Sequence, residues 1–405
     1  GSALCRIPPL MVCNPDEANQ NGGGDASSKF DSVSPGSGIL VVAGQGGGGA
    51  GFWKPGNYGF LDLGNGAKAV AKGLGWLGPG GGCTSIQGAD TISPDDPDDE
   101  ISTEPGLNGG AIDSINSRFD IYQNNTTCPG DNNMPGQQCP AAFNSRKDLV
   151  QLTANVPVTN KDTCKVSKLP QKTGWHEPAE TYNPGTNRLL DFAAGDTVPD
   201  SMGHPRDTCH AWDQAGDCAD GRFGDGIWDR NAYFRSHYKR TVAGTGSPAG
   251  TQWNENDWKT NLKSAGNEYP IPSMQIDNVT RYQVYLWEVA NAGDVIDGVE
   301  ILAPHNVGTD EQNHATPVCS QYENFSSTTV DPDRRVFTIA VVNCEAEGIK
   351  GKQDDVQIAD WIDVFLVQPS ADRENTDKFD MYFEFIRKTD LTVTGVNNAA
   401  LIRRD

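Results

Sequence analysis

The clearest pattern of hydrophobic and polar positions lies after about residue 270, where the spacing of apolar residues approaches two. In Asp380-Met-Tyr-Phe-Glu-Phe-Ile386, Met381, Phe383 and Phe385 alternate with Tyr382 and Glu384, which predicts a strand with one buried and one wetter face. Segments of this kind are rich in Val, Ile, Phe and Tyr and are bounded by turn residues. They predict four strands: Arg281 to Val289, Arg335 to Cys344, Trp361 to Gln368 and Lys378 to Ile386.

Helical spacing is weaker and confined to short segments. Asp229 is a good N-cap residue before Arg230 to Tyr238, where the aromatic residues fall on one side. Asn254 to Leu262 predicts a second helix, and Ile112 to Ile115 a brief one. A helix at Ala67 to Trp76 contains two glycines and would depend on tertiary contacts.

The remaining sequence predicts loops. Residues 1 to about 60 are punctuated by Gly and Pro and predict an irregular lead-in, and residues 123 to 200 show little periodicity. The predicted class is α+β and β-dominated, with an antiparallel or mixed sheet in the C-terminal half, short helices and long disulfide-pinned loops. Three regions follow, 1–200, 201–270 and 271–405, or else one continuous domain.

Composition narrows the function classes. The 405 residues include 46 Gly and 25 Pro, and the formal charge is −22. Such a charge opposes binding to nucleic acid and to anionic lipid because both repel it. The longest apolar runs, Gly38 to Gly44 and Val336 to Val342, are far shorter than the roughly 20 residues that span a bilayer.

The chain contains ten cysteines, an even number that favours disulfides in an oxidising compartment. Proximity in sequence predicts four small loops, with the two remaining cysteines paired over a long one. The predicted pairs are Cys5 with Cys13, Cys128 with Cys139, Cys209 with Cys218, Cys319 with Cys344, and Cys83 with Cys164.

An acidic, glycine-rich segment lies directly before the helix predicted at Arg230. Calcium takes six to eight oxygen ligands from a loop that can fold around it, so the segment is a candidate calcium site. The alternative is a glycine-rich turn in which the last carboxylate caps the helix and the others face water. The candidate ligands are Asp213, Asp217, Asp220, Asp225 and Asp229.

Other chemistry has less support. His204, Cys209 and His210 lie close together, and with His176 or His237 they raise the question of zinc, but Cys209 is better assigned to a disulfide. Neither a G-x-S-x-G motif nor a distinctive Cys–His pair is present, so no catalytic residue and no organic cofactor is assigned. Carboxylates beside aromatics remain as general acid or base candidates for a hydrolase: Glu104, Asp120, Glu288 and Asp363.

Several motifs recur in order along most of the chain and together resemble one family. They include Cys5-Arg-Ile-Pro-Pro-Leu-Met-Val-Cys13, Ile101-Ser-Thr-Glu-Pro-Gly106, Tyr282-Gln-Val-Tyr-Leu-Trp-Glu288, Pro317-Val-Cys-Ser320 and Asp380-Met-Tyr-Phe-Glu384. The chain resembles TadG-like proteins of the tight-adherence (Flp-type) pilus system of bacteria. Proteins of that family usually begin with a membrane-spanning helix, so the resemblance implies that this chain is the exported C-terminal region.

The resemblance implies a non-enzymatic component, periplasmic, cell-surface or extracellular, that supports pilus assembly, anchoring or adhesion. Its partners would be pilus or envelope proteins or copies of itself. The alternatives are a self-assembling secreted filament subunit or calcium-dependent adhesin, and a secreted hydrolase. Aromatic residues are either interface anchors or core: Trp53, Tyr58, Phe60, Trp228, Tyr233 and Phe234.

Overall fold

The computed structural model describes separate stretches of the chain, and the statements below concern these stretches. They are residues 10–15, 28–43, 56–62, 70–71, 73–75, 100–104, 109–122, 141–147, 151–152, 175–176, 182–185, 188–200, 202–210, 222–241, 250–303, 315–317, 334–349, 351–370 and 379–389.

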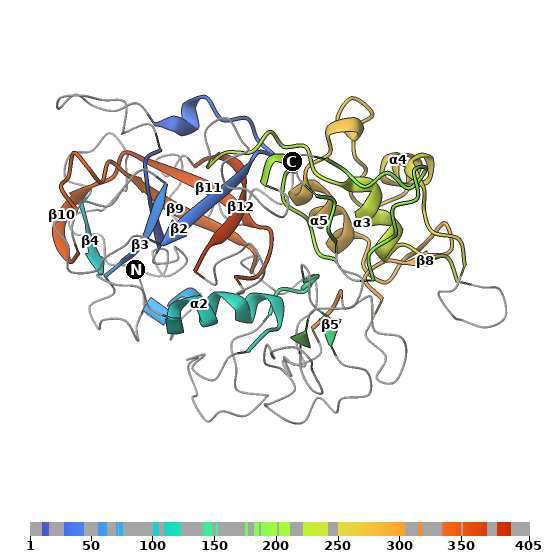
Figure 1. Ribbon diagram of the computed structural model, residues 1–405, viewed down its shortest axis with the longest axis horizontal. Coiled ribbons are helices and arrows are strands. Elements are labelled where there is room, and N and C mark those ends of the chain that lie inside the picture. The colour runs from blue at the N-terminus through green and yellow to red at the C-terminus, as the bar shows by residue number, and fades with distance from the viewer. Residues whose placement is uncertain are drawn as a thin grey trace.

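Eight strands form one mixed sheet in the order β1-β9-β11-β12-β2-β3-β4-β10 (Figure 1). An additional antiparallel pairing of β1 with β3 closes the series from β1 to β3 into a ring, and β4 and β10 extend from β3. The strands are β1 (Leu10–Cys13), β2 (Gly38–Ala43), β3 (Asn57–Leu61), β4 (Glu100–Glu104), β9 (Val336–Val342), β10 (Gln353–Gln357), β11 (Asp360–Leu366) and β12 (Met381–Lys388).

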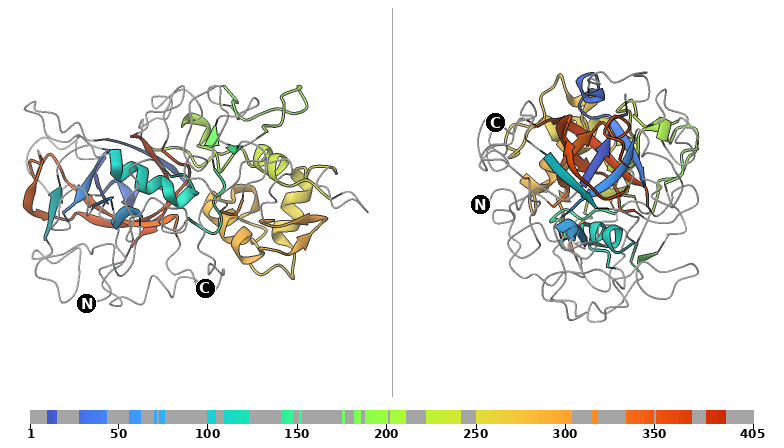
Figure 2. Two further views of the ribbon diagram at one scale, coloured as in Figure 1. Left: turned by 90° about the horizontal axis from the view of Figure 1, so that it is seen from below. Right: turned by 90° about the vertical axis from the view of Figure 1, so that its left-hand side faces the viewer.

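Strands from both ends of the chain alternate in this ring. β1 runs parallel to β9, and β2 runs parallel to β3, whereas the other neighbours are antiparallel. The right-hand view in Figure 2 shows the N-terminal (blue) and C-terminal (red) strands gathered together. The predicted β-dominated α+β class and the mixed sheet are confirmed, and the sheet extends into the N-terminal part, for which no strand was predicted.

The inside of the curled sheet is filled by alternate residues of its strands. On β12 these are Met381, Phe383 and Phe385, as the alternation predicts. Removing these apolar side chains from water stabilises the ring. The inward residues of the other ring strands are Leu10, Val12, Ile39, Val41, Tyr58, Phe60, Phe337, Ile339, Val341, Ile362, Val364 and Leu366.

Helix α2 (Gly109–Asn116) packs against the same core through Ala111, Ile112 and Ile115. It lies along the strands in the left-hand view of Figure 2 and is followed by a 3₁₀ turn, η4 (Ser117–Phe119). Val70 and Leu74, in the described helical residues of the predicted segment Ala67 to Trp76, join this core as well. Both predicted short helices are therefore confirmed.

A second part of the molecule is helical and lies beside the sheet (Figure 1). Its helices are α3 (Arg230–His237), α4 (Glu255–Lys263) and α5 (Arg281–Ala290). They enclose a core dominated by aromatic rings, among them Phe234, Trp258 and Trp287. Two short hairpin-like pairs and three further 3₁₀ turns complete the described elements: β5 (Gln151–Leu152), β6 (Trp175–His176), β7 (Val295–Ile296), β8 (Val299–Glu300), η3 (Lys29–Asp31), η5 (Thr208–His210) and η6 (Ile276–Asn278).

The predicted N-cap at Asp229 is confirmed, because its carboxylate accepts a hydrogen bond from Ala232 N at 2.9 Å. Asn254 caps α4 in the same way and forms a reciprocal pair with Asp257. Such caps satisfy backbone N–H groups that the first turn leaves unpaired. The sequence therefore located both of these helix starts.

The prediction of a strand at Arg281 to Val289 is wrong, because this segment is helix α5. Its β-branched and aromatic residues favour a strand, but Thr280 and Gln283 form a capping box that starts a helix. The buried residues then fall at helical spacing on two faces: Arg281 and Tyr285 meet the sheet, and Val284 and Trp287 join the aromatic core of the helical part.

The predicted wetter face of β12 is also absent, since α5 covers it. Tyr382 and Glu384 are as buried as the inward residues of the same strand. Tyr382 packs with Leu40, Tyr285 and Phe365 in a second, outer cluster. A strand buried on both faces can keep a polar residue only if that residue is paired, as Glu384 is.

The predicted irregular lead-in over residues 1 to 60 is wrong for its described parts, which supply β1, β2 and β3. Glycine and proline in this region mark turns between strands rather than an absence of strands. Gly56, for example, has φ +74° directly before β3. The four residues of β1 are too short a run to be recognised by alternation.

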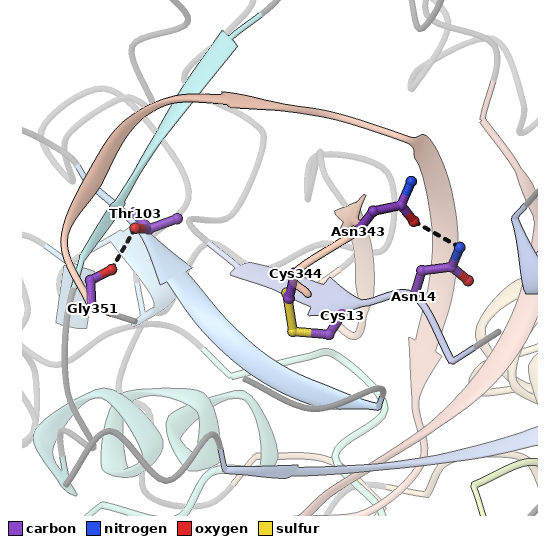
Figure 3. Close-up of a disulfide and its surroundings, with 6 residues drawn as sticks. All are labelled: Cys13, Asn14, Thr103, Asn343, Cys344 and Gly351. Carbon is purple, nitrogen blue, oxygen red and sulfur yellow. Dashed lines mark hydrogen bonds between the residues drawn. A yellow bond between two sulfur atoms is a disulfide. The ribbon is translucent and has the colours of Figure 1, made fainter. Parts of the chain in front are cut away.

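Cys13 and Cys344, which are 331 positions apart in the sequence, form a disulfide with Cα atoms 5.3 Å apart (Figure 3). The predicted pairs Cys5 with Cys13 and Cys319 with Cys344 are therefore wrong. The parallel register of β1 and β9 places Cys13 opposite Val342, and Cys344 follows two residues later. Sheet register, which proximity in sequence does not show, decides this pairing.

Cys209 is also disulfide-bonded, with a partner outside the described residues. Its predicted pair, Cys218, lies there too. The other predicted pairs stay predictions, because their members fall outside the described residues: Cys83, Cys128, Cys139 and Cys164.

Replacing both Cys13 and Cys344 by Ser should lower the free energy of unfolding by about 2 to 5 kcal/mol, because the link no longer restricts the unfolded chain. Urea unfolding of the oxidised proteins followed by tryptophan fluorescence measures the loss. A double variant as stable as the wild type would show that β1 is held by its strand contacts alone.

Candidate functional site

A layer of buried charged and polar side chains lies where the outer face of β12 and β11 meets α5 and α3. We call it the polar layer. It has two parts, one centred on Arg281 at the start of α5 and one centred on Glu288, two turns further along the same helix. Both residues are fully buried, so each charge depends on protein partners rather than on water.

Arg281 binds two carboxylates. Its guanidinium lies 2.6 Å from Asp207 Oδ1 and 2.6 Å from Glu384 Oε2. It also donates to the carbonyls of Pro205 and Gly36 at 3.0 and 2.9 Å. One side chain therefore ties α5 to β12, to the segment before η5 and to the turn before β2.

Glu384 in turn accepts hydrogen bonds from two backbone N–H groups of the first turn of α5. These are Arg281 N at 2.9 Å and Tyr282 N at 2.9 Å. A carboxylate is favourable there because the first turn has unpaired donors and the positive end of the helix dipole. Glu384 thus fixes the start of α5 onto β12 twice, by charge and by backbone pairing.

Asp207 joins the start of β2 to the segment before α3. Its Oδ2 accepts from Gly38 N at 2.9 Å and from Gly226 N at 2.8 Å. At Gly38 an added Cβ would lie 1.8 Å from the Tyr382 hydroxyl, so a larger residue would force this buried ring to move. That hydroxyl accepts from Asp207 N at 3.2 Å and lies 3.1 Å from His210 Nδ1.

Glu288 is surrounded by donors. Tyr233 and Tyr238 of the α3 region both donate to its Oε1 at 2.5 Å, and Asn144 donates to Oε2. Arg146 Nε lies 3.2 Å from Oε1 and supplies the neutralising charge. The carboxylate therefore joins α5, α3 and the segment 141–147.

Arg335 and His204 extend this part towards the sheet. Arg335 donates to the carbonyls of Leu366 and Val367 and stacks on Phe365, with the guanidinium carbon 4.4 Å from the ring centroid. Its Nη2 lies 3.3 Å from His204 Nδ1, and His204 stacks on Tyr233. The polar layer thus runs without interruption from α5 to the start of β9.

Burial and neighbouring charges settle the protonation states here. Burial, followed by the Arg335 and Arg146 charges, lowers the pKa of His204 well below 6.5. Burial and the Glu288 charge raise the pKa of Tyr233 and Tyr238 well above 10. At neutral pH the imidazole and both phenols are therefore uncharged.

Lys147 lies at the same border and is almost fully buried. Burial lowers its pKa to about 8, although the Asp120 carboxylate acts in the opposite direction. Arg146, next to it, keeps a raised pKa because Glu288 and the two tyrosines outweigh the effect of burial. The segment 144–147 is thus packed into the interior rather than offered to a ligand.

The carboxylates singled out as acid or base candidates do not form one group. Glu288 belongs to the polar layer, and Asp363 accepts from Thr338 Oγ1 at 2.7 Å and Arg387 Nε at 3.0 Å. Asp120 is buried with φ 62° after η4, and Glu104 is in β4 opposite Phe60. Each belongs to a different local structure, so no acid–base pair stands out among them.

The acidic segment is described only in its second half. Asp229 Oδ2 accepts from Leu190 N at 2.8 Å in addition to the α3 cap, and burial raises its pKa. Asp225 is exposed, and its Oδ1 accepts from Ile227 N at 2.9 Å. These two residues match the alternative to a calcium site, in which the last carboxylate caps the helix and the others face water. Asp213, Asp217 and Asp220 lie outside the described residues, and calcium binding stays a prediction.

His204, His210 and the described aromatic residues that the sequence singled out are buried. His204 and His210 contact different partners, Arg335 and Tyr382, and Cys209 between them is in a disulfide, as predicted. The core interpretation of the aromatics is confirmed for the described residues, whereas Trp53 lies outside them. The buried aromatics are Tyr58, Phe60, Trp228, Tyr233 and Phe234.

Sequence reasoning missed Arg281, Asp207, Glu384 and Arg335. The available signal was a charged residue inside an apolar run, as with Glu384 in Met381 to Phe385. A charge in such a place is either exposed on one face or buried with a partner. Choosing between these requires knowing that α5 covers the strand.

Comparison with known proteins gives no relatives. No family model matches the chain, and neither a curated protein nor a solved structure is similar to it. Among the described residues, none of the helices has both the length and the apolar character needed to cross a membrane. In the same residues, no group of three or more His, Cys, Asp or Glu is arranged to hold a metal ion.

Replacing Glu288 by Gln should lower the free energy of unfolding by about 3 to 5 kcal/mol, because Arg146 would stay buried without its counter-charge. Chemical denaturation of both proteins measures the difference. The matched control is Asp196→Asn, which removes the partner of Arg188 in an exposed pair and should cost far less. Equal losses would contradict the structural role of the polar layer.

Stability should fall as the pH drops below about 6.5. In this pH range His204 binds a proton in the unfolded chain but not in the folded chain, because folding lowers its pKa. Proton uptake therefore favours the unfolded state. One proton corresponds to a slope of at most about 1.4 kcal/mol per pH unit. Denaturation at a series of pH values measures it, and His204→Gln should flatten the curve between pH 6.5 and 5. An unchanged slope in that variant would show that other groups cause the loss.

Proposed function

We propose that this chain is a non-enzymatic cell-envelope or extracellular component that supports the assembly, anchoring or adhesion of a tight-adherence pilus. The proposal starts from the sequence resemblance to TadG-like proteins. It places the chain in the periplasm, at the cell surface or outside the cell. Its partners are pilus or envelope proteins, or copies of itself, and not nucleic acid.

The observation that carries the non-enzymatic part of the proposal is the state of Glu288. Of the four candidate carboxylates it has the richest chemical surroundings, with two tyrosines, an arginine and a histidine. It is nevertheless fully buried, and its donors join three segments of the chain. A general acid or base must reach the proton that it transfers, so this arrangement supports a structural role.

The disulfides support an exported location. Cys13, Cys209 and Cys344, the three cysteines in the described residues, are all disulfide-bonded. Disulfides persist in the periplasm and outside the cell and are rare where thiol reductants act. An acidic surface with net charge −22 suits a protein that must remain dissolved there.

Two other functions remain as alternatives. A filament subunit that assembles from this chain alone, or an adhesin that needs calcium, would fit the same compartment. Electron microscopy of the native extracellular fraction distinguishes them: thin pili that carry this chain support the first proposal, and filaments of this chain alone support a subunit. A secreted hydrolase is the third and least supported alternative.

Deleting the gene should abolish piliation or surface attachment, and a copy with Asp363→Asn or Asp225→Asn should restore it. An interface does not depend on one proton-transfer group, whereas loss of a general acid or base costs a factor of about 10² to 10⁴ in rate. Counting pili by electron microscopy and attached cells by microscopy provides the two measurements.

The contrary outcome is also specific. If one folded carboxylate variant failed while the other restored attachment, and if the wild-type protein released sugars or peptides from a surface polymer, the hydrolase alternative would replace the proposal. Circular dichroism and thermal melts of each purified variant establish that it is folded before it is scored.

A further inference from the structure

Strand β1 closes the ring of strands and is the shortest of its members. It lies between β3, which it meets antiparallel, and β9, which it meets parallel. Without β1 both neighbours would present a row of unpaired backbone groups. The space between β3 and β9 is therefore a slot for one strand, and we call it the β1 slot.

What fills the β1 slot is specified by strand register and side-chain size. Leu10 and Val12 point into the core inside the ring. Met11 and Cys13 point to the other side, into a separate hydrophobic cluster that contains Ala340 and Trp361. All four residues are buried. Gly56 N and Asn14 N extend the pairing beyond the strand through Cys13 O at 3.0 Å and Val342 O at 2.8 Å. The β1 strand of another copy would make every one of these contacts.

The other end of the sheet is poorly suited to adding a strand. Among the described residues β10 pairs with β4, and its register is broken between Gln353 and Val356. Asp355 has φ 59°, and it and Asp354 are exposed. Bulges and charges of this kind oppose edge-to-edge association. If two copies associate through hydrogen bonds between strands, the β1 slot is therefore a better place for it than the β10 edge.

The order of the chain means that β1 is made long before its slot is complete. Cys13 comes near the start and Cys344 lies 331 residues later, so β1 exists before β9 has been made. Residues 16–27, which connect β1 to the next described segment, are enough chain to span at most about 40 Å. Two neighbouring copies can thus exchange β1 before either ring closes, and exchange of an identical element is a low-cost route to association.

We propose that the β1 slot accepts either the β1 strand of its own chain or that of a second copy. The disulfide between Cys13 and Cys344 then links the slot covalently to whichever strand has entered it. Joining the Cys13 and Cys344 thiols releases two electrons and two protons, which a disulfide-containing oxidant takes up as it is reduced to its dithiol. When the disulfide forms within one copy, the product is a closed monomer. When it forms between copies, the product is a covalently linked pair in which each ring is completed by its neighbour. This inference concerns self-association and does not depend on the proposed pilus function.

The test uses the complete wild-type chain. Equal amounts of unlabelled and ¹⁵N-labelled protein are reduced, unfolded and refolded together under oxidising conditions at several concentrations. Mass spectrometry then quantifies peptides that link Cys13 to Cys344. We expect peptides with one labelled and one unlabelled half, with a fraction that rises with protein concentration towards one half, and a disulfide-linked dimer on non-reducing gels.

Two single variants give a matched control. Refolding Cys13→Ser with Cys344→Ser leaves the linkage between copies as the one way to form this disulfide, so a linked dimer should appear in the mixture. Each variant refolded alone should give little dimer, because the remaining cysteine is buried in the ring.

Linked peptides without any mixed-isotope form, at every concentration at which the disulfide reforms fully, would overturn the proposal. If the single variants do not fold, the wild-type mixing experiment still decides the question. Loss of piliation on gene deletion bears on the proposed function alone, so the two proposals can fail separately.

Discussion

Arg281 carries a charge that is fully withdrawn from water, and the junction between the helices and the sheet is arranged around it. A guanidinium in such a place needs counter-charges and enough acceptors for its fixed set of donors. Asp207 and Glu384 supply the charges, and the carbonyls of Pro205 and Gly36 supply further acceptors. Meeting these demands together fixes the positions of α5, of β12, of the turn before β2 and of the segment before η5. Loss of Arg281 would leave two buried carboxylates without their counter-charge.

The Glu288 part of the polar layer applies the same constraint two turns along α5. Its donors come from α3, from Tyr238 at the end of that helix and from the segment 141–147. Apolar packing tolerates small shifts of one element on another, whereas paired charges and short hydrogen bonds do so poorly. The aromatic core around Trp253 and Trp287 supplies burial, and the polar layer sets the orientation of that core on the sheet.

A structural feature of this chain can be predicted from the sequence when the residues that determine it are neighbours in the sequence. The cap at Asp229, the helix beginning near Asn254 and the alternation in β12 are local signals, and all three were predicted. The class was found too, because three of the four predicted strands lie in the sheet. The helix α5 was mistaken for a strand because Val, Tyr and Trp were given more weight than the Thr280 and Gln283 capping box. The Cys13 partner and the roles of Arg281 and Glu384 depend on which elements meet, and no neighbouring residue reveals that.

The interleaving of early and late strands has a consequence for how such a chain can fold. β2 lies against β12, and β1 lies against β9, so each of the first two described strands gains one of its two neighbours only after most of the chain exists. Contacts between residues so far apart in sequence are slow to form, because long loops must close first. The disulfide then acts last, because Cys13 and Cys344 meet only when β1 has entered the ring, and it locks a closure that a four-residue strand holds weakly by itself.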